Sequence, residues 1–239
     1  MAPRNRRILV IDVGGTTIKV SHSEQPDPVK IPSGPTMTAR AMVMAVKKTT
    51  AQWKYDAVSI GYSGPVANGR PATEPPHLAA GWMKLDFAKS FGRPVRMIND
   101  AAMQALGNYE GGRMLYLGLG TGFGTAMIFE RVIEPLELSN LPYRAGRNYG
   151  DYVASRGLLR LGEAKWRRQV LTVMELFRTA LQPDYVVAGG GNARLLKTLP
   201  EHTRLGIDNG AHIGGLRLWD DCGECESWSW KTKSAWPRC

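Results

Sequence analysis

The chain has 239 residues, enough for one large domain or two smaller ones, and its 43% hydrophobic content is that of a globular protein. No stretch approaches the ~18 apolar residues of a membrane helix, and the apolar run behind the basic N-terminus is too short for a signal peptide, so we expect a cytoplasmic protein with no membrane partner. The net charge of +10 indicates either an anionic partner or a surface charge that only serves solubility. No helix-turn-helix, zinc-finger or RNP-like pattern accompanies that charge, so we expect no nucleic-acid partner.

Hydrophobic periodicity predicts strands and helices that alternate along the chain. In chain order, the predicted elements are strands over 7–13 and 18–21, a helix over 36–53, a strand over 57–62, a helix over 85–91, a strand over 95–99, a helix over 100–108, strands over 114–119 and 125–129, a helix over 163–181, a strand over 185–188, and helices over 193–199 and 211–219. Residues 130–149 are polar and irregular. Two α/β halves, each opening with a β-hairpin, follow from this order, and ligands of such folds bind in a cleft at strand ends.

Three of the predicted strands end in glycine-bearing turns. Because a glycine has no side chain, its N–H group can approach a polyanion closely, and neighbouring threonine hydroxyls can donate as well. The common phosphate patterns are absent: there is no GxxxxGK[ST], and a strand rather than a helix follows the GxGxGxG run. The candidate phosphate-binding residues are Gly14, Gly15, Thr16, Thr17, Gly120, Thr121, Gly122, Gly124, Gly189, Gly190, Gly191 and Asn192.

Two acidic residues stand at predicted strand ends. Asp12 precedes the first glycine turn and is either a turn-forming residue or a group that orients water on Mg²⁺, which prefers carboxylates, waters and substrate phosphates. Asp100 follows Asn99 where a strand becomes a helix, so it suits an N-cap, a general base that accepts a hydroxyl proton, or both. The sequence therefore indicates phosphoryl transfer to an alcohol.

All three cysteines lie in the last eighteen residues. Cys222 and Cys225 form a CxxC, and Cys239 follows, but a structural zinc site usually needs four ligands. We expect residues 221–239 to form a disordered tail and expect no zinc.

These motifs together resemble the ROK family of sugar kinases in the actin/hexokinase superfamily, and most of all its polyphosphate glucokinases. The similar segments run from Ile8 to Trp219 and read IDVGGTTIKV, GYSGPV, GRPVRMINDA, LGLGTGFGTAMI, EPLEL, KWRRQV, PDYVVAGGGNARLLKTLP and NGAHIGGLRLW. The resemblance implies an α/β fold of two actin-like (ribonuclease H-like) ATPase domains around a cleft. The domains implied are 1–110, joined by the last helix 209–220, and 111–208.

The resemblance also implies roles for individual residues. Asp100 corresponds to the catalytic base and Lys19 to part of the first phosphate turn, and the Mg²⁺ role of Asp12, through water, agrees with both. Residues 189–192 correspond to the segment that meets adenosine in nucleotide-using relatives. The sugar-binding residues implied are Gly64, Asn99, Asp100, Glu137 and Asn140.

The implied activity is transfer of a phosphoryl group from polyphosphate, ATP or both to the 6-hydroxyl of glucose, by a Mg²⁺-dependent homodimer. Two departures leave an alternative open. The family usually reads Glu-Leu-Gly-His where this chain has Glu137-Leu138-Ser139-Asn140, and a further sugar-binding glutamate has no clear counterpart. The alternative is a sugar-binding or regulatory protein on the kinase scaffold with weakened catalysis.

Overall fold

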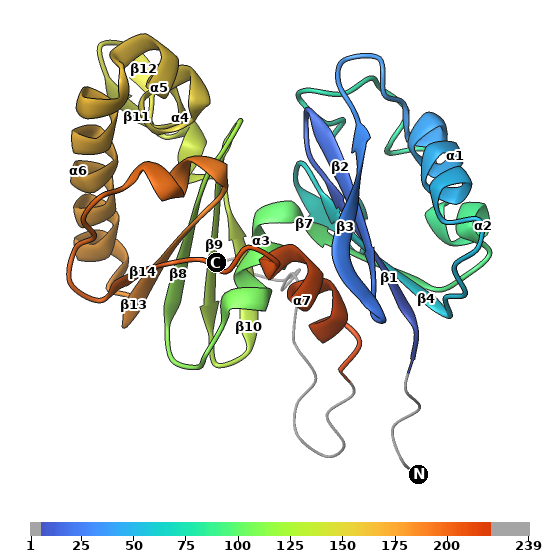
Figure 1. Cartoon of the computed structure of the whole chain (residues 1–239). Coiled ribbons are helices and arrows are strands. Elements are labelled where there is room, and N and C mark those ends of the chain that lie inside the picture. The colour runs from blue at the N-terminus through green and yellow to red at the C-terminus, as the bar shows by residue number, and fades with distance from the viewer. Residues whose placement is uncertain (1–5, 221–239) are drawn as a thin grey trace, which may run out of the picture.

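A computed structural model describes residues 6–220, so the expectations for the tail and its cysteines lie outside the described residues. Figure 1 shows two lobes, each built on a five-stranded mixed sheet. The first sheet has the order β3 (Gln25–Pro32), β2 (Thr17–His22), β1 (Ile8–Val13), β4 (Ala57–Tyr62) and β7 (Val95–Asn99). The second has the order β10 (Val132–Leu136), β9 (Phe123–Phe129), β8 (Met114–Leu119), β13 (Tyr185–Gly189) and β14 (Thr203–Leu205).

The two sheets have the same connectivity. In each, the first three strands pair antiparallel as a meander, and the last two add in parallel beside the first strand. Two short hairpins lie outside the sheets, β5 (Val66–Ala67) with β6 (Arg70–Pro71) and β11 (Pro142–Arg144) with β12 (Arg147–Asn148). The repeated order puts the glycine turn of each half at the same place, between the first two strands of its sheet.

Helices cover both faces of each sheet (Figure 1). Helices α1 (Ala39–Thr49) and α2 (Phe87–Phe91) pack on the outer face of the first sheet, and α4 (Gly150–Val153), α5 (Ser155–Leu161) and α6 (Glu163–Leu181) pack on the outer face of the second. Helices α3 (Asp100–Asn108) and α7 (Gly210–Arg217) lie between the sheets. The 3₁₀ turns η1 (Leu138–Asn140) and η2 (Gly191–Leu195) follow β10 and β13.

The buried strand β1 contributes side chains to the hydrophobic clusters on both faces of the first sheet. Its alternate residues Leu9, Ile11 and Val13 belong to the cluster under α1, whereas Ile8 and Val10 belong to the cluster that α3 shares with the second sheet. Successive side chains of a strand point to opposite faces, so a continuous apolar run is what a strand covered on both faces requires.

Helices α3 and α7 cross at glycines. A Cβ atom on Gly214 would overlap the carbonyl oxygen of Met103, and one on Gly107 would overlap that of Gly210. Helix α7 also contacts β1 and β4, so the last described helix joins the first sheet. The division into residues 1–110 with 209–220 and residues 111–208 stays a prediction.

Several sequence-based boundaries were wrong. The helix expected over 36–53 is shorter, because Thr38 caps its first turn with its side-chain oxygen. Strand β3 was missed because it is an exposed edge strand with prolines, and β10 was missed within the polar stretch 130–149. The helix expected over 193–199 is the 3₁₀ turn η2, and α4 and α5 were not expected. Within residues 6–220, no helix has the length and apolar character needed to cross a membrane.

Candidate active site

Asp12 lies near the end of β1 and is 7% exposed. Its neighbour across the hairpin in β2 is Lys19, and the Lys19 Nζ lies 3.6 Å from the Asp12 Oδ2. Burial raises the pKa of Asp12, and the charge of Lys19 opposes that rise. Asp12 is therefore a buried carboxylate with one partly exposed cation beside it.

Asp100 is the first residue of α3 and is partly buried. The expected N-cap role belongs instead to Asn99, whose Oδ1 accepts from the backbone N–H of Ala102 at 3.1 Å. The Asp100 Oδ1 accepts from the N–H of Ala101 at 2.8 Å. Because Asn99 provides the cap, Asp100 is not needed for that purpose and its carboxyl group is available for other chemistry.

The pKa of Asp100 is raised to about 7. Burial is the main cause, and the negative charges of Asp12 and Glu137 raise it further, against the hydrogen bond from Ala101. Asp12 and Asp100 together also raise the pKa of the buried Tyr116, although burial contributes most there. A carboxyl group that titrates near neutrality is suited to proton transfer at physiological pH.

The first turn of α3 also contacts the second sheet. A Cβ atom on Gly124 in β9 would lie 2.7 Å from the Cβ of Ala101, so only glycine allows β9 to approach this closely. Gly124 belongs to the second predicted phosphate turn, and Ala101 follows the predicted base. The structure therefore brings the start of α3 and the second predicted phosphate turn together.

A cavity of about 220 Å³ lies between elements of both sheets. Strands β1 and β2 contribute Asp12 and Lys19 to its wall, and α3 contributes Gln104. The ends of β13 and β14, the segments after them and the start of α7 supply the rest, including three of the predicted nucleotide-segment residues, Gly189, Gly190 and Gly191. Residues 14–17 and 120–124 and the predicted sugar residues lie outside this lining.

The second glycine turn is joined to the nucleotide-type segment by Ser155. Its Oγ donates to the Gly120 carbonyl at 2.8 Å and accepts from the Asn192 Nδ2 at 3.0 Å. Gly190 has φ +81°, and a Cβ there would lie 2.5 Å from the Leu119 carbonyl oxygen. The turn and the Gly190 segment therefore hold each other in place at the cavity.

The tips of the two predicted phosphate turns are partly exposed. The amide of Gly14 donates to the Thr17 carbonyl at 3.1 Å, and the amide of Gly120 donates to the Gly122 carbonyl at 3.1 Å. These two amides close their own turns. Residues at the tips, such as Gly15 and Thr121, are the ones left to contact a ligand.

The predicted sugar residues form two small groups. In one, the Asn99 Nδ2 donates to the Gly64 carbonyl at 3.2 Å, next to Asp100. In the other, the Asn140 Nδ2 donates to the Glu137 Oε2 at 3.3 Å. The effect of Glu137 on the Asp100 pKa places the two groups within electrostatic range of each other. Asn140 thus hydrogen-bonds to Glu137, the neighbouring predicted sugar residue.

Sequence reasoning missed two residues of this site, Gln104 and Ser155. Gln104 could have been found, since it lies one turn after Asp100 on the same helix face. It accepts from the Tyr116 hydroxyl at 2.6 Å and so connects α3 to the second sheet. Ser155 carries no signal, because it follows a four-residue helix that periodicity does not reveal. Asp151, the nearest acid to the missing sugar-binding glutamate, pairs with Arg156 at 3.0 Å.

The residues present suit a magnesium ion. Mg²⁺ keeps several waters and takes one or two carboxylates plus substrate phosphates. Asp12 offers a buried carboxylate in the cavity wall, with its pKa raised by burial, so a nearby cation would stabilise the ionised form.

The sequence pattern of the ROK family matches residues 8–134, which is more than half of the chain. A comparison with curated proteins gives no match.

Solved structures share the fold at low identity. An inorganic polyphosphate/ATP-glucomannokinase from Arthrobacter sp. strain KM superposes with a TM-score of 0.70 at 21% identity, covering 89% of this chain and 98% of the other. A ROK family glucokinase from Streptomyces griseus, solved with glucose and AMPPNP, gives 0.70 at 18% identity, covering 87% and 98%. A ROK hexokinase from Thermus thermophilus gives 0.59 at 21%, covering 88% and 97%. The predicted fold of two actin-like lobes is confirmed.

Proposed function

The chain belongs to the ROK family of sugar kinases, and we propose that it transfers a phosphoryl group to the 6-hydroxyl of a hexose, with glucose as the first substrate to test. The observation that supports this most is the Asp100 carboxyl group, whose pKa of about 7 is raised in part by the charge of Asp12. Asp12 in turn lines the cavity together with glycine-rich backbone. A base with that pKa accepts a hydroxyl proton at neutral pH.

In the proposed reaction, Asp100 accepts the proton of the sugar hydroxyl as the oxygen attacks the terminal phosphorus. The leaving phosphate chain lies in the cavity near Lys19 and Gly190, with amides at the tips of both glycine turns donating to phosphate oxygens. Asp12 would hold Mg²⁺ through water, and the ion would neutralise developing charge on the phosphates. Gly64, Asn99, Glu137 and Asn140 would hold the sugar, and closure of the lobes would exclude water as a competing acceptor.

Polyphosphate, ATP or both serve as the proposed donor. The net charge of +10 favours a polyanion, and the cavity beside Gly189–Gly191 holds only about 220 Å³, below the ~300–1,000 Å³ of pockets for drug-sized ligands. Both observations favour a phosphate chain, which is thinner than a nucleotide. The family resemblance implies a nucleotide-binding role for residues 189–192, so ATP remains a proposed donor.

A donor-by-sugar activity matrix tests the proposal. Purified protein with Mg²⁺ is given ATP, GTP or polyphosphate with glucose, mannose or N-acetylmannosamine, and phosphosugar is measured. We expect product from glucose with at least one donor. Strict use of ATP would overturn the polyphosphate proposal alone. Calorimetric binding of hexose without product from any donor would favour the weakened, sugar-binding alternative.

A further inference from the structure

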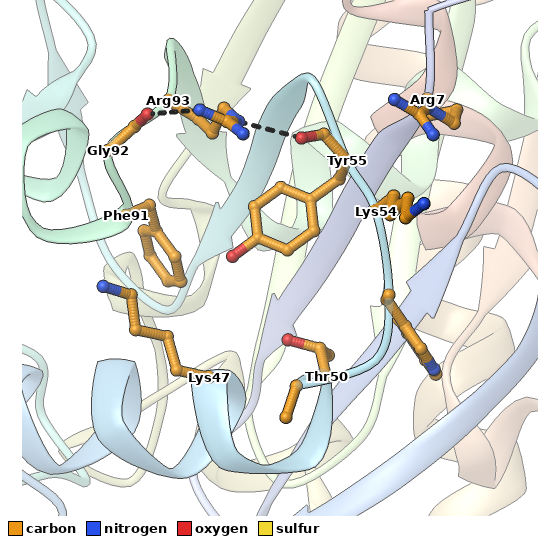
Figure 2. Close-up of a pocket in the computed structure, with 10 residues that line it drawn as sticks. Arg7, Lys47, Thr50, Lys54, Tyr55, Phe91, Gly92 and Arg93 are labelled. Atoms are coloured by element: carbon orange, nitrogen blue, oxygen red, sulfur yellow. Dashed lines mark hydrogen bonds between the residues drawn. The ribbon is translucent and has the colours of Figure 1, made fainter.

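A second cavity, of about 520 Å³, opens at the end of β1 opposite to the Gly14 turn. Arg7, directly before the first residue of β1, lines it together with the end of α1, residues 50–51 and 53–55, and residues 91–93 at the end of α2 (Figure 2). The six residues of β1 span about 20 Å. This cavity is therefore separate from the proposed active site.

Four cationic side chains converge on this cavity from separate parts of the chain: Arg7, Lys47, Lys54 and Arg93. The carboxylate of Asp56 pairs with Arg7 at 3.1 Å and offsets one of the four charges. Within residues 6–220, no acidic residue lines the cavity itself. On a solvated helix face, the charged side chains all belong to one segment. Here they come from separate segments and line one cavity, which is more typical of a binding site.

The two arginines are held in place by hydrogen bonds or an ion pair, whereas the two lysines have no ion-pair partner among the described residues. The Arg93 Nε donates to the Tyr55 carbonyl at 2.9 Å, and its Nη1 donates to the Gly92 carbonyl at 3.1 Å. Among the described residues, neither Lys47 nor Lys54 has an ion-pair partner. Figure 2 shows Lys47 extending from α1 toward Phe91. Ammonium groups that surround a hollow without a counter-ion attract an anion.

The floor of the cavity is aromatic. Phe91 is 5% exposed, and Trp53 and Tyr55 are half-buried against the core of the first lobe. Burial raises the pKa of the Tyr55 hydroxyl, and the charge of Arg93 opposes that rise. Apolar walls beneath the cations reduce the screening of their charge by water, so an anion in this hollow is attracted more strongly than at a flat surface.

We propose that this cavity binds an oligophosphate anion, meaning a chain of two or more phosphates that is free or part of a nucleotide. Arginine guanidinium groups fit phosphate oxygens in pairs, and lysines add point charges. A chain with several negative charges matches the excess of three positive charges. This site is additional to the proposed kinase function and does not depend on it.

The test follows resonances of the cavity itself during titration of ¹⁵N-labelled protein with inorganic tripolyphosphate. We expect the Trp53 indole and Gly92 amide signals to shift and saturate, with affinity that weakens as salt rises. The double substitution Lys47→Glu/Lys54→Glu is expected to weaken binding at these signals by about tenfold or more. Lys48→Glu is the matched control, because Lys48 is exposed on α1 but lies outside the lining.

Parallel titrations with ATP and citrate identify the ligand class. If tripolyphosphate binds more tightly than ATP at the Trp53 and Gly92 signals, the ligand is a free phosphate chain. If ATP binds more tightly, the ligand is a nucleotide. An equal response to citrate, no shift at Trp53 and Gly92, or equal shifts in the double variant would overturn the proposal. The Gly15 amide in the same spectra reports binding at the proposed active site, so failure of one site is distinguishable from failure of the other.

Discussion

Asp12 at the end of β1 lies close enough to Asp100 at the start of α3 for its negative charge to raise the Asp100 pKa. Burial raises the Asp100 pKa more than Asp12 does, and burial, Asp12 and Glu137 together bring it to about 7. The pairing resembles other sites where neighbouring carboxylates keep one of the pair protonated near neutrality.

A direct consequence concerns the titration of Asp100. We expect ¹³C NMR of its carboxyl carbon to show a midpoint near pH 7 in the free protein, and Asp12→Asn to move that midpoint lower, because the repelling charge is gone. Asp27→Asn, at an exposed position in β3, is the matched control and should leave the midpoint unchanged. A midpoint near 4 in the unmodified chain would contradict the assignment.

The same shift makes stability depend on pH. The unfolded chain releases the Asp100 proton near pH 4, whereas the folded chain retains it up to about pH 7, so this group's favourable contribution is complete below pH 4 and is lost as the pH rises to 7. Asp100→Asn should therefore raise the free energy of unfolding at pH 8 by about 1–3 kcal/mol and change it little at pH 4. Urea unfolding at both pH values measures this. An equal effect at the two pH values would contradict it.

Ser155 is a positioning residue for the second glycine turn. Ser155→Ala removes its hydrogen bonds to Gly120 and Asn192, and we expect KM for the phosphoryl donor to rise about tenfold, with a smaller change in KM for the sugar. Ser90→Ala is the control, since that hydroxyl also donates to a backbone carbonyl but lies in α2. Equal changes in both KM values would indicate a general structural defect instead.

The crossing of α3 and α7 gives a prediction on stability. Gly214→Ala places a methyl group against the Met103 carbonyl, and we expect the free energy of unfolding to fall by about 1–3 kcal/mol. Gly122→Ala should change it far less, because a Cβ there meets open space. Denaturant unfolding measures the free energy of unfolding of both variants and of the unmodified protein. Similar values for both would mean that the crossing tolerates a side chain.

The parts of the fold that the sequence predicted are those with strong periodicity. The buried run of β1 and the one-sided apolar pattern of α6 left little choice of structure. Strand β3 has no such pattern because it is exposed at a sheet edge and carries prolines. Helices α4 and α5 are too short to complete the repeats that reveal a helix.

The site could be predicted from the sequence only in part, because some of its contacts join segments that are far apart in the chain. Glycine turns and acids at strand ends were visible as local patterns, and the structure places Asp12, Lys19 and Gly190 at one cavity. Ser155 bonds to Gly120, which is 35 positions away in the sequence, and to Asn192, which is 37 positions away. No local sequence pattern encodes such contacts. The cavity of about 520 Å³ likewise depends on Arg7 and Arg93, which are far apart in the sequence but line the same hollow.

The measurement that tests the central claim most directly compares kcat of Asp100→Asn with that of the unmodified protein, using glucose, Mg²⁺ and the best donor. Hexose binding to both proteins is measured by calorimetry in the same preparations. The account predicts retained sugar binding and a kcat lower by about 10²–10⁴, the usual contribution of a general base. Turnover near that of the unmodified protein would contradict it.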